Sequence, residues 1–567
     1  MHLIDPPEEF IIIKIGQNTR GGCFAPYSST RGFYHHQDWP EHPQVCVPEL
    51  RDPSIRYMRK KQLFQLSFLI TSCIPFLIWS IKNINLDLWY DEIYTLRVYV
   101  FAPLIKTVSY YNTPNNHIFF NLLLNLYLKS LNISKITPVI NSPSVIRILM
   151  LFYCLIGIYY FYKVGKILLN FLSSILAVVL LATTIPFINF SLQIRGYCLS
   201  TTLSILLVYH LLRFEEKSDW KNGLMIVFAT ALALYTIPSN LYFILSVMFF
   251  YFGYQIIRFE KYKRTSNSWL ASIRLAVLDF PMRIIYLICA SILLAVILYL
   301  PVLGEVINNP YVKSHGLFRF TTITQLMPQT FLYFIYGKWW LIPFVIIGLV
   351  AGLQSQGSKK FLYHVLFCLT LLIVPFLISS IRGDKPFGRT FVNLSFIMVL
   401  LVVLCLDKFI FSWKIPGTYS NWVMAALLVL NYGSAFWAEK QVDQHIFTDI
   451  ITGNKSQDLL YNYFLEHYSP SKVLSHFASN GYDRSIPVYL VYEGDVIATR
   501  LYIGNNNIKF KAIDDTLAGL VPNASGEAYV ITAFPNMFLS QLVNNLPGIN
   551  CVILNDFDFV NVFKCQT

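Results

Sequence analysis

Apolar runs of roughly 20 residues recur along this chain from residue 62 to residue 437, with short polar loops between them. An α-helix of that length crosses a hydrocarbon layer of about 30 Å. The pattern therefore predicts a polytopic α-helical membrane protein with about eleven spans. They are expected near residues 62–81, 145–162, 167–187, 198–213, 222–237, 240–257, 284–300, 339–353, 360–380, 390–407 and 421–437.

The segment 82–143 is too long and too polar to be a simple turn, and it carries two amphipathic stretches at roughly 91–108 and 115–131. We interpret both as helices that lie at the membrane surface. The second stretch is also long enough for a short span. That alternative would place Lys163 and Lys166 outside and reverse the later basic loops, so the surface interpretation is preferred.

The pattern changes at about residue 440, where short β-like stretches begin to alternate with helix-like ones. It predicts a small C-terminal α/β domain over 439–567, next to a transmembrane domain over 58–438. The expected strands are 486–492, 508–513, 528–534, 549–554 and 559–563, and the expected helices are 458–477 and 535–546. Cys551 and Cys565 flank a strand-turn-strand and either form a disulfide or are two unrelated cysteines.

The first 57 residues are polar, contain several prolines and lack apolar periodicity, which predicts a poorly ordered N-terminal extension. Met58 directly precedes Arg59-Lys60-Lys61, so it is an alternative start of the protein. The apolar stretch after Lys61 is full length and lacks a small-residue cleavage site, which argues against a cleavable signal peptide.

Composition agrees with the membrane class, since 55% of the 567 residues are hydrophobic and only 13% are charged, with a mean hydropathy of +0.51. The net charge of +13 does not indicate nucleic-acid binding, because Lys and Arg lie in short loops between apolar runs. By the positive-inside rule, the N-terminus is cytoplasmic and the C-terminal domain extracytoplasmic. We expect a multi-pass protein of the cell (inner or plasma) membrane.

Two adjacent carboxylates, Asp91 and Glu92, follow the first span amid Trp89, Tyr90 and Tyr94. If a surface helix begins near residue 88, both lie in its first turn, where the helix dipole stabilises negative charge. Helix stability alone is therefore one explanation of the pair. The other is catalysis, since an ionised carboxylate at the exit face of a membrane can accept a proton from an attacking hydroxyl.

Several short motifs share this predicted outer face, and together they resemble the GT-C membrane glycosyltransferases, near the protein O-mannosyltransferases and the bacterial aminoarabinose transferases. The resemblance covers roughly residues 62–400. It rests on Trp89-Tyr90-Asp91-Glu92, Asn115-Asn116-His117, Gln193-Ile194-Arg195-Gly196-Tyr197 and Pro386-Phe387-Gly388-Arg389.

The resemblance implies an inverting transfer of a sugar from a polyprenyl-phosphate donor to an acceptor, in the context of the cell envelope. Asp91 would be the general base that takes the acceptor proton, and Glu92 would position Asp91 or the substrate. The residues lead to the same chemistry, since attack on an anomeric carbon needs a base on one side and a stabilised phosphate leaving group on the other.

Cations at the outer face are the candidate partners of that phosphate, because positive charge is scarce there. Arg195, with Tyr197 beside it, is the first, and Lys385 and Arg389 share a later outer loop. Ordinary headgroup contact explains Lys385 and Arg389 equally well. Asn116 and His117 are candidate substrate-binding residues, with helix capping as the simpler explanation of His117.

Two other functions use similar substrates: a transporter or flippase of lipid-linked glycans, and a polysaccharide polymerase. A transporter needs a polar route through the membrane midplane, whereas the ionisable groups here gather at one face. No nucleotide-binding motif, phosphate loop or metal-type cysteine spacing is present. No cofactor is required by this sequence, and a divalent metal near the carboxylates is compatible with it. The expected partners are the lipid-linked donor, membrane lipids and an acceptor that the sequence does not identify.

Overall fold

The structure, a computed structural model, describes most of the transmembrane domain and the sheet of the C-terminal domain. The described residues run from 53 to 435 and from 485 to 566. The gaps within them are 89, 112–115, 266–276, 278, 310–317, 356, 384–385, 387, 413–421, 492–509, 514–516, 518–519, 521–525, 533–534 and 558–559.

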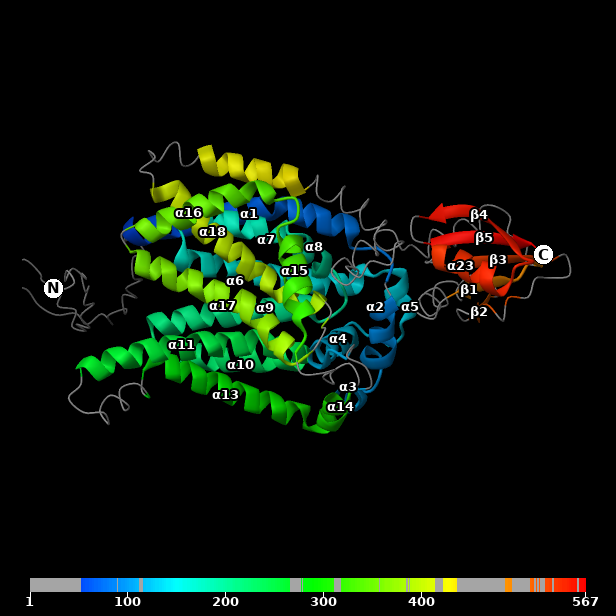
Figure 1. Cartoon of the computed structure of the whole chain (residues 1–567), viewed down its shortest axis with the longest axis horizontal. Coiled ribbons are helices and arrows are strands. Elements are labelled where there is room, and N and C mark those ends of the chain that lie inside the picture. The colour runs from blue at the N-terminus through cyan, green and yellow to red at the C-terminus, as the bar shows by residue number, and fades with distance from the viewer. Residues whose placement is uncertain are drawn as a thin grey trace, which may run out of the picture. The chain divides into compact units, whose positions relative to one another are not determined.

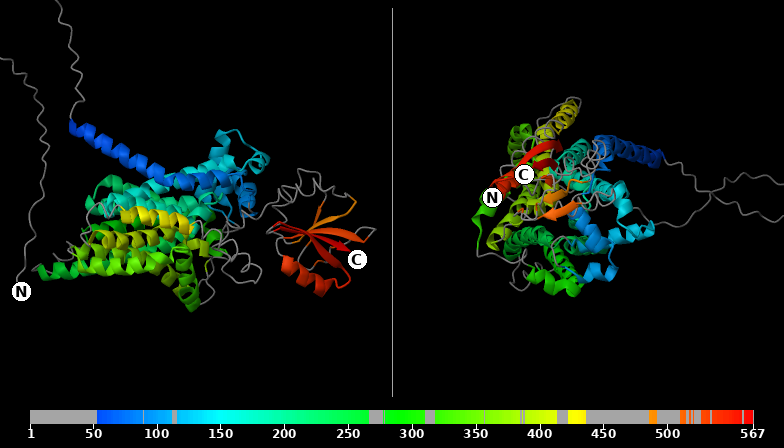
Figure 2. Two further views of the ribbon diagram at one scale, coloured as in Figure 1. Left: turned by 90° about the horizontal axis from the view of Figure 1, so that it is seen from above. Right: turned by 90° about the vertical axis from the view of Figure 1, so that its right-hand side faces the viewer.

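Long helices run side by side in the first of these parts (Figures 1 and 2), and within the described residues seven of them are long and apolar enough to cross a membrane. This confirms the predicted class of a polytopic helical membrane protein. The seven are α1 (Pro53–Asn83), α6 (Ser144–Leu168), α9 (Tyr197–Glu216), α11 (Leu241–Thr265), α13 (Phe280–Tyr299), α17 (Ser358–Ile381) and α18 (Ser395–Ser412).

Two further spans are broken. Helix α7 (Phe171–Ala182) is followed by α8 (Ile185–Ser191) at a bend of 65°. The segment Thr322–Phe334, which contains η4 (Thr322–Leu326) and α15 (Met327–Phe334), meets Trp339–Gln354 at a bend of 90°. The second segment contains η5 (Trp339–Leu341) and α16 (Ile342–Gln354).

With the broken pairs counted, the described residues hold up to nine candidate spans, fewer than the predicted eleven. All eleven predicted segments are helical, but two of them are too short to qualify. Helix α10 (Trp220–Thr236) has 17 residues, and the helix Trp422–Ala435 is shorter still. At a rise of 1.5 Å per residue, a helix of 17 residues is about 26 Å long, short of a hydrocarbon layer of about 30 Å.

The segment after α1 is more broken than predicted. Instead of one helix over 91–108 it forms α2 (Tyr90–Thr95), a π-helical turn η1 (Leu96–Val100) and α3 (Leu104–Ser109). Pro103 precedes α3 in an extended conformation and has no N–H to donate, so a helix cannot continue through it. The second predicted surface helix is α4 (Ile118–Ser130), followed by α5 (Thr137–Asn141).

Short connecting elements complete this part: η2 (Pro238–Asn240), η3 (Leu300–Val302), α14 (Leu303–Asn308) and η6 (Gly388–Leu394). At the N-terminus, α1 begins at Pro53, so residues 53–57 of the predicted extension are helical. The rest of that extension and the predicted helix 458–477 lie outside the described residues.

The C-terminal domain contains a five-stranded mixed sheet in the order β2-β1-β3-β5-β4, and its strands match the predicted positions. Phe538 of helix α23 (Pro535–Asn545) packs on Phe563 with ring centroids 5.0 Å apart, which covers one face of the sheet. The strands are β1 (Val488–Val491), β2 (Phe510–Ile513), β3 (Glu527–Thr532), β4 (Asn550–Phe557) and β5 (Val560–Gln566).

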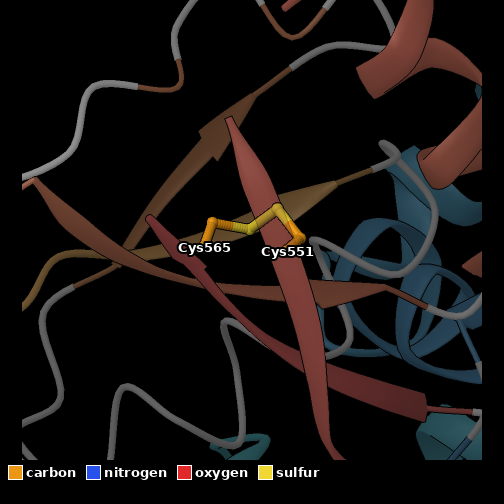
Figure 3. The surroundings of a disulfide bond; sticks show 2 residues. All are labelled: Cys551 and Cys565. Carbon is orange, nitrogen blue, oxygen red and sulfur yellow. A yellow bond between two sulfur atoms is a disulfide. The ribbon is translucent and has the colours of Figure 1, made fainter. Parts of the chain in front are cut away.

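Strands β4 and β5 form the predicted strand-turn-strand. They pair antiparallel in a register that places Cys551 opposite Cys565. The two cysteines form a disulfide (Figure 3), which decides between the two alternatives left open by the sequence.

Candidate active site

The predicted acidic pair lies in the first turn of α2, and both carboxylates are buried, with Asp91 6% and Glu92 0% exposed. Burial of two adjacent carboxylates is costly unless cations or hydrogen-bond donors compensate the charge. Each carboxylate has such partners, and the partners differ. The two residues therefore have separate roles in the structure.

Asp91 lies between two arginines from distant parts of the chain. Its Oδ2 forms an ion pair with Nη1 of Arg195, which lies between α8 and α9. The same oxygen is 3.7 Å from Nη1 of Arg389, in η6. The structure thus brings together the predicted base and two of the predicted phosphate-binding cations, and the side chains of Asp91 and Arg195 are at most 8% exposed.

Glu92 connects two segments of the backbone. Its Oε1 accepts a hydrogen bond of 2.7 Å from the N–H of Ile194, and its Oε2 is 3.5 Å from Nη2 of Arg147. With no exposed surface and a donor at each oxygen, Glu92 joins the segments that contain Ile194 and Arg147. Its contact with Ile194 lies one residue before Arg195, so Glu92 holds the backbone that carries this arginine, and its positioning role in catalysis stays a prediction.

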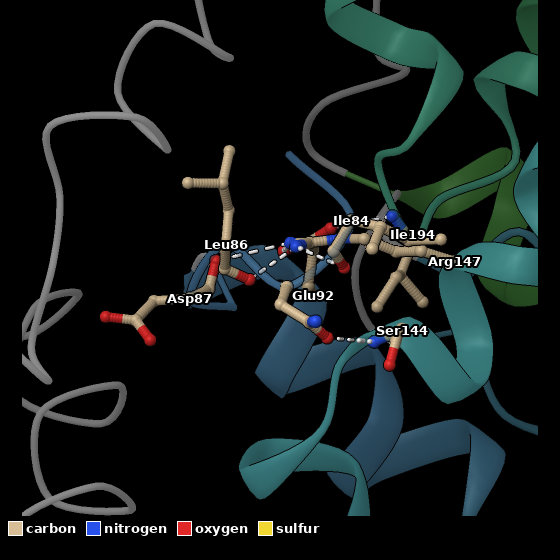
Figure 4. Close-up of polar contacts among 8 residues, drawn as sticks. Ile84, Leu86, Asp87, Glu92, Ser144, Arg147 and Ile194 are labelled. Atoms are coloured by element: carbon tan, nitrogen blue, oxygen red, sulfur yellow. Dashed lines mark hydrogen bonds and ion pairs between the residues drawn. The ribbon is translucent and has the colours of Figure 1, made fainter. Parts of the chain in front are cut away.

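Arg147 is a site residue that our sequence analysis did not identify. It lies in the first turn of α6, is 1% exposed and donates to the carbonyl groups of the segment that leads into α2 (Figure 4). The acceptors are the backbone oxygens of Ile84, Leu86 and Asp87. A cation at the end of a span where basic residues are scarce was the signal that could have found it.

His117 comes directly before α4 and contacts the same loop as Arg195. Its Nδ1 accepts a hydrogen bond of 2.8 Å from the N–H of Gly196. Burial lowers the pKa of His117 well below its ordinary value, and the positive charges of Arg195 and Arg389 lower that pKa further. The imidazole is therefore neutral near pH 7, with the proton assigned to Nε2 because Nδ1 is the acceptor.

Gly196 is required by this contact. A Cβ atom added to it would lie 2.8 Å from Nδ1 of His117 and 2.8 Å from Cγ2 of Thr236, closer than side chains normally approach. Tyr197 then begins α9, with its ring edge-on to His117 at 5.2 Å and 5.3 Å from the guanidinium carbon of Arg195. The ring supplies an aromatic face on which the arginine rests.

Asn116 holds the backbone around it. Its amide donates to the backbone oxygens of Thr107 (3.0 Å) and Tyr110 (2.8 Å), and its Oδ1 accepts from Asn121 (2.9 Å). With both N–H groups engaged, Asn116 orders the chain leading to His117. Lys385, the remaining predicted site residue, lies outside the described residues, as do Trp89 and Asn115.

Within the described part of the chain, no group of three or more His, Cys, Asp or Glu side chains is arranged to hold a metal ion. The ion-paired cluster consists of three guanidinium groups and two carboxylates: Arg147, Arg195, Arg389, Asp91 and Glu92. Counted over the described residues of the cluster, the formal charges are three positive and two negative.

A buried lysine lies away from this cluster, where the two broken spans meet. Lys338, in the bend between α15 and η5, is 3% exposed, and its Nζ donates to the backbone oxygen of Thr183 at 2.9 Å. Thr183 ends α7, so Lys338 provides a hydrogen-bond donor for a carbonyl group at that helix end. Lys338 directly precedes the predicted span 339–353, and its contact with α7 was not predicted from the sequence.

Several solved structures are similar to this chain over most of its length. The fold is similar to that of ArnT from Cupriavidus metallidurans. Its crystal structure in the apo state matches with a TM-score of 0.44 and 11% identity, over 89% of this chain and 98% of ArnT. The crystal structure of ArnT bound to undecaprenyl phosphate gives a TM-score of 0.42 and 11% identity, over 88% and 97% of the two chains.

The arabinofuranosyltransferase AftD from Mycobacteria, determined by single-particle cryo-electron microscopy, matches with a TM-score of 0.39 and 12% identity. The similarity covers 88% of this chain and 40% of AftD. The sequence matches no protein-family model, and sequence comparison finds no match among curated proteins.

Proposed function

We propose that this protein is a membrane glycosyltransferase that moves a sugar from a polyprenyl-phosphate donor to an acceptor, with inversion at the anomeric carbon. The observation that carries the proposal is the convergence of Arg195 and Arg389 on the buried carboxylate of Asp91. A candidate proton acceptor therefore lies in contact with two candidate phosphate-binding groups, as expected from the sequence motifs.

In the proposed reaction, the acceptor hydroxyl gives its proton to Asp91 as its oxygen bonds to the anomeric carbon. The bond from that carbon to the phosphate oxygen breaks on the opposite side, and the polyprenyl phosphate leaves with one more negative charge. Arg195 and Arg389 stabilise that charge, because a planar guanidinium binds phosphate oxygens through paired hydrogen bonds.

Asp91 must exchange partners during this cycle. In the structure its carboxylate is the anion that the two arginines hold. The phosphate of a donor has the same charge and the same acceptor geometry, so it competes for the guanidinium groups. A carboxylate released from one of them is then able to accept a proton.

The remaining site residues support this exchange. Glu92 and Arg147 join the backbone before α2 to the loop that carries Arg195, and they fix the spacing between the base and the phosphate-binding groups. His117 fixes Gly196 on the other side of Arg195. We propose that the reaction needs no metal, since the arginines supply the positive charge.

The disulfide of the C-terminal domain supports the predicted orientation. Disulfides persist in oxidising compartments outside the cytoplasm, and the C-terminal domain contains one. We therefore propose that the C-terminal domain and the active site are extracytoplasmic, where a lipid-linked donor would be used.

The Asp91→Asn variant tests the proposal. Membranes from expressing cells receive radiolabelled polyprenyl phosphates that carry a pentose or a hexose, and transfer of label to an acceptor is measured. The variant should lose about 10²- to 10⁴-fold in transfer rate, the usual contribution of a general base. It should also bind sugar-free polyprenyl phosphate more tightly than wild type, because the competing carboxylate charge is gone.

Asp87→Asn is the matched control. Asp87 is a half-buried carboxylate on the same segment, and its side chain points away from Arg147 and Glu92 in Figure 4. Its replacement should leave transfer and phosphate binding close to wild type. Full transfer activity in Asp91→Asn would remove Asp91 as the base.

A transporter of lipid-linked glycans is the second candidate, and the two broken spans favour it. Discontinuous helices form the substrate sites of many transporters, and here the breaks meet at Lys338 and Thr183. Movement of the labelled lipid across the membrane without transfer of its sugar would decide for this alternative.

A further inference from the structure

The five residues from Leu192 to Gly196 form the loop between α8 and α9 that carries Arg195, and polar groups at three of its positions have partners from other elements. The N–H of Ile194 donates to Glu92, the guanidinium of Arg195 pairs with Asp91, and the N–H of Gly196 donates to His117. The backbone oxygen of Gln193 accepts from the N–H of Arg195 at 2.7 Å. The side-chain amide of Gln193 belongs to the same loop.

That amide is buried without a hydrogen-bond partner among the residues that the structure describes. Gln193 is 1% exposed, and both its Nε2 and its Oε1 lack a partner. A buried amide without hydrogen bonds costs roughly 1–3 kcal/mol by protein mutational data. Such groups are uncommon in native proteins, where water or a ligand usually satisfies them.

We propose that Gln193 binds the sugar of the lipid-linked donor through hydroxyl groups on its ring. A carboxamide offers a donor and an acceptor side by side, so its complement must supply both. A phosphate accepts hydrogen bonds but cannot donate one to Oε1 when it is ionised, and a polyprenyl chain does neither. Hydroxyl groups on a sugar ring do both.

The position in the loop agrees with this chemistry. Gln193 is two residues from Arg195, and the hydrogen bond between their backbones holds them together. In the donor the sugar is attached directly to the phosphate. If Arg195 holds the phosphate, Gln193 is then close enough in the chain to reach the sugar. The inference rests on the proposed function and adds a residue that would select the sugar.

The Gln193→Met variant tests the inference, because methionine is unbranched and similar in length but has no amide. Binding of two lipids to the purified protein is compared: polyprenyl phosphate carrying a pentose or a hexose, and sugar-free polyprenyl phosphate. The variant should bind the sugar-bearing lipid about ten- to a hundredfold more weakly. Its affinity for the sugar-free lipid should be unchanged.

Thermal stability distinguishes a binding role from a structural one. Removal of an unsatisfied buried amide should leave the melting temperature of Gln193→Met equal to or above that of wild type. Gln255→Met is the matched control, because Gln255 is a buried glutamine in helix α11 and not in this loop, and its replacement should affect the binding of neither lipid.

The possible outcomes separate this inference from the proposed function. Equal affinity of wild type and Gln193→Met for the sugar-bearing lipid would overturn the role of Gln193, with water as the partner of the amide. Equal loss of affinity for both lipids would also overturn it. Failure of the wild-type protein to bind either lipid would instead overturn the proposed function, and the Gln193 inference with it.

Discussion

His117 shows how the site sets the charge state of a single residue. Its ring is buried, accepts a hydrogen bond from Gly196 and lies near two arginines, so its pKa is lowered well below 6.5. A neutral imidazole near those arginines avoids adding a further positive charge. The neutral ring accepts the hydrogen bond from Gly196 and so holds the loop that carries Arg195.

Acid should destabilise the protein through this residue. Because the folded pKa lies below the unfolded value of about 6.5, the unfolded chain binds an extra proton in acid. The stability from neutral His117 is fully present above pH 6.5. It is lost as pH falls towards the folded pKa, at up to about 1.4 kcal/mol per pH unit.

The His117→Asn variant provides the measurement, since its Oδ1 can still accept from Gly196 but does not titrate. Melting temperatures from pH 7.5 to pH 5 should fall more steeply for wild type than for the variant. Parallel curves would show that His117 does not enter the folded state neutral.

At the scale of elements, close backbone contact holds the helices together. Lipid tails are as apolar as leucine side chains, so membrane helices associate through close packing at small residues. Gly348 of α16 faces the backbone oxygen of Cys405 in α18, and Gly352 faces the ring of Phe361 in α17. These glycines bring three helices together around the end of the second broken span.

Gly348→Ala should disrupt this packing. The added Cβ would lie 2.0 Å from the Cys405 oxygen, so α16 and α18 must separate. We expect a loss of about 1–3 kcal/mol in the free energy of unfolding, measured by thermal or denaturant unfolding in detergent. Gly253→Ala in α11 meets nothing within 4 Å and should instead stabilise the helix by about 0.5–1 kcal/mol. Equal changes in the free energy of unfolding for the two variants would contradict the close contact between α16 and α18.

At the scale of the whole molecule, orientation is carried by charge. Basic residues cluster in alternate loops, such as the one with Arg213, Lys217 and Lys221 between α9 and α10. Charges of this kind stay on the cytoplasmic side during insertion. The same rule predicts that the C-terminal domain lies on the opposite side of the membrane.

Single cysteines test this orientation with a membrane-impermeant thiol reagent on intact cells. Val543→Cys, at a position 71% exposed in α23, should be labelled directly. Trp220→Cys, at a position 73% exposed at the start of α10, should be labelled only after permeabilisation. The unsubstituted chain is the control for labelling of the native cysteines. Labelling of Trp220→Cys on intact cells, with Val543→Cys labelled only after permeabilisation, would show that the protein has the opposite orientation.

Some site contacts were accessible from the sequence and others were not. Asp91, Arg195 and Arg389 were predicted as site residues because their types and their expected face of the membrane are local properties. Arg147 was missed, because nothing in the first turn of α6 shows that its guanidinium reaches carbonyl groups about 60 residues earlier. The single helix expected over 91–108 was wrong because Pro103 interrupts it, which amphipathic periodicity alone does not reveal.

The sequence by itself determined the membrane class, the positions of the apolar helices and the five strands. These follow from hydrophobic length, alternation and residue type, all of which act over a few neighbouring residues. Only the tertiary structure decided that two arginines share one carboxylate of Asp91, that Glu92 is held by Arg147 and Ile194, and that Cys551 bonds to Cys565. Contacts of this kind depend on how elements pack, and packing is set by the shapes of many side chains at once.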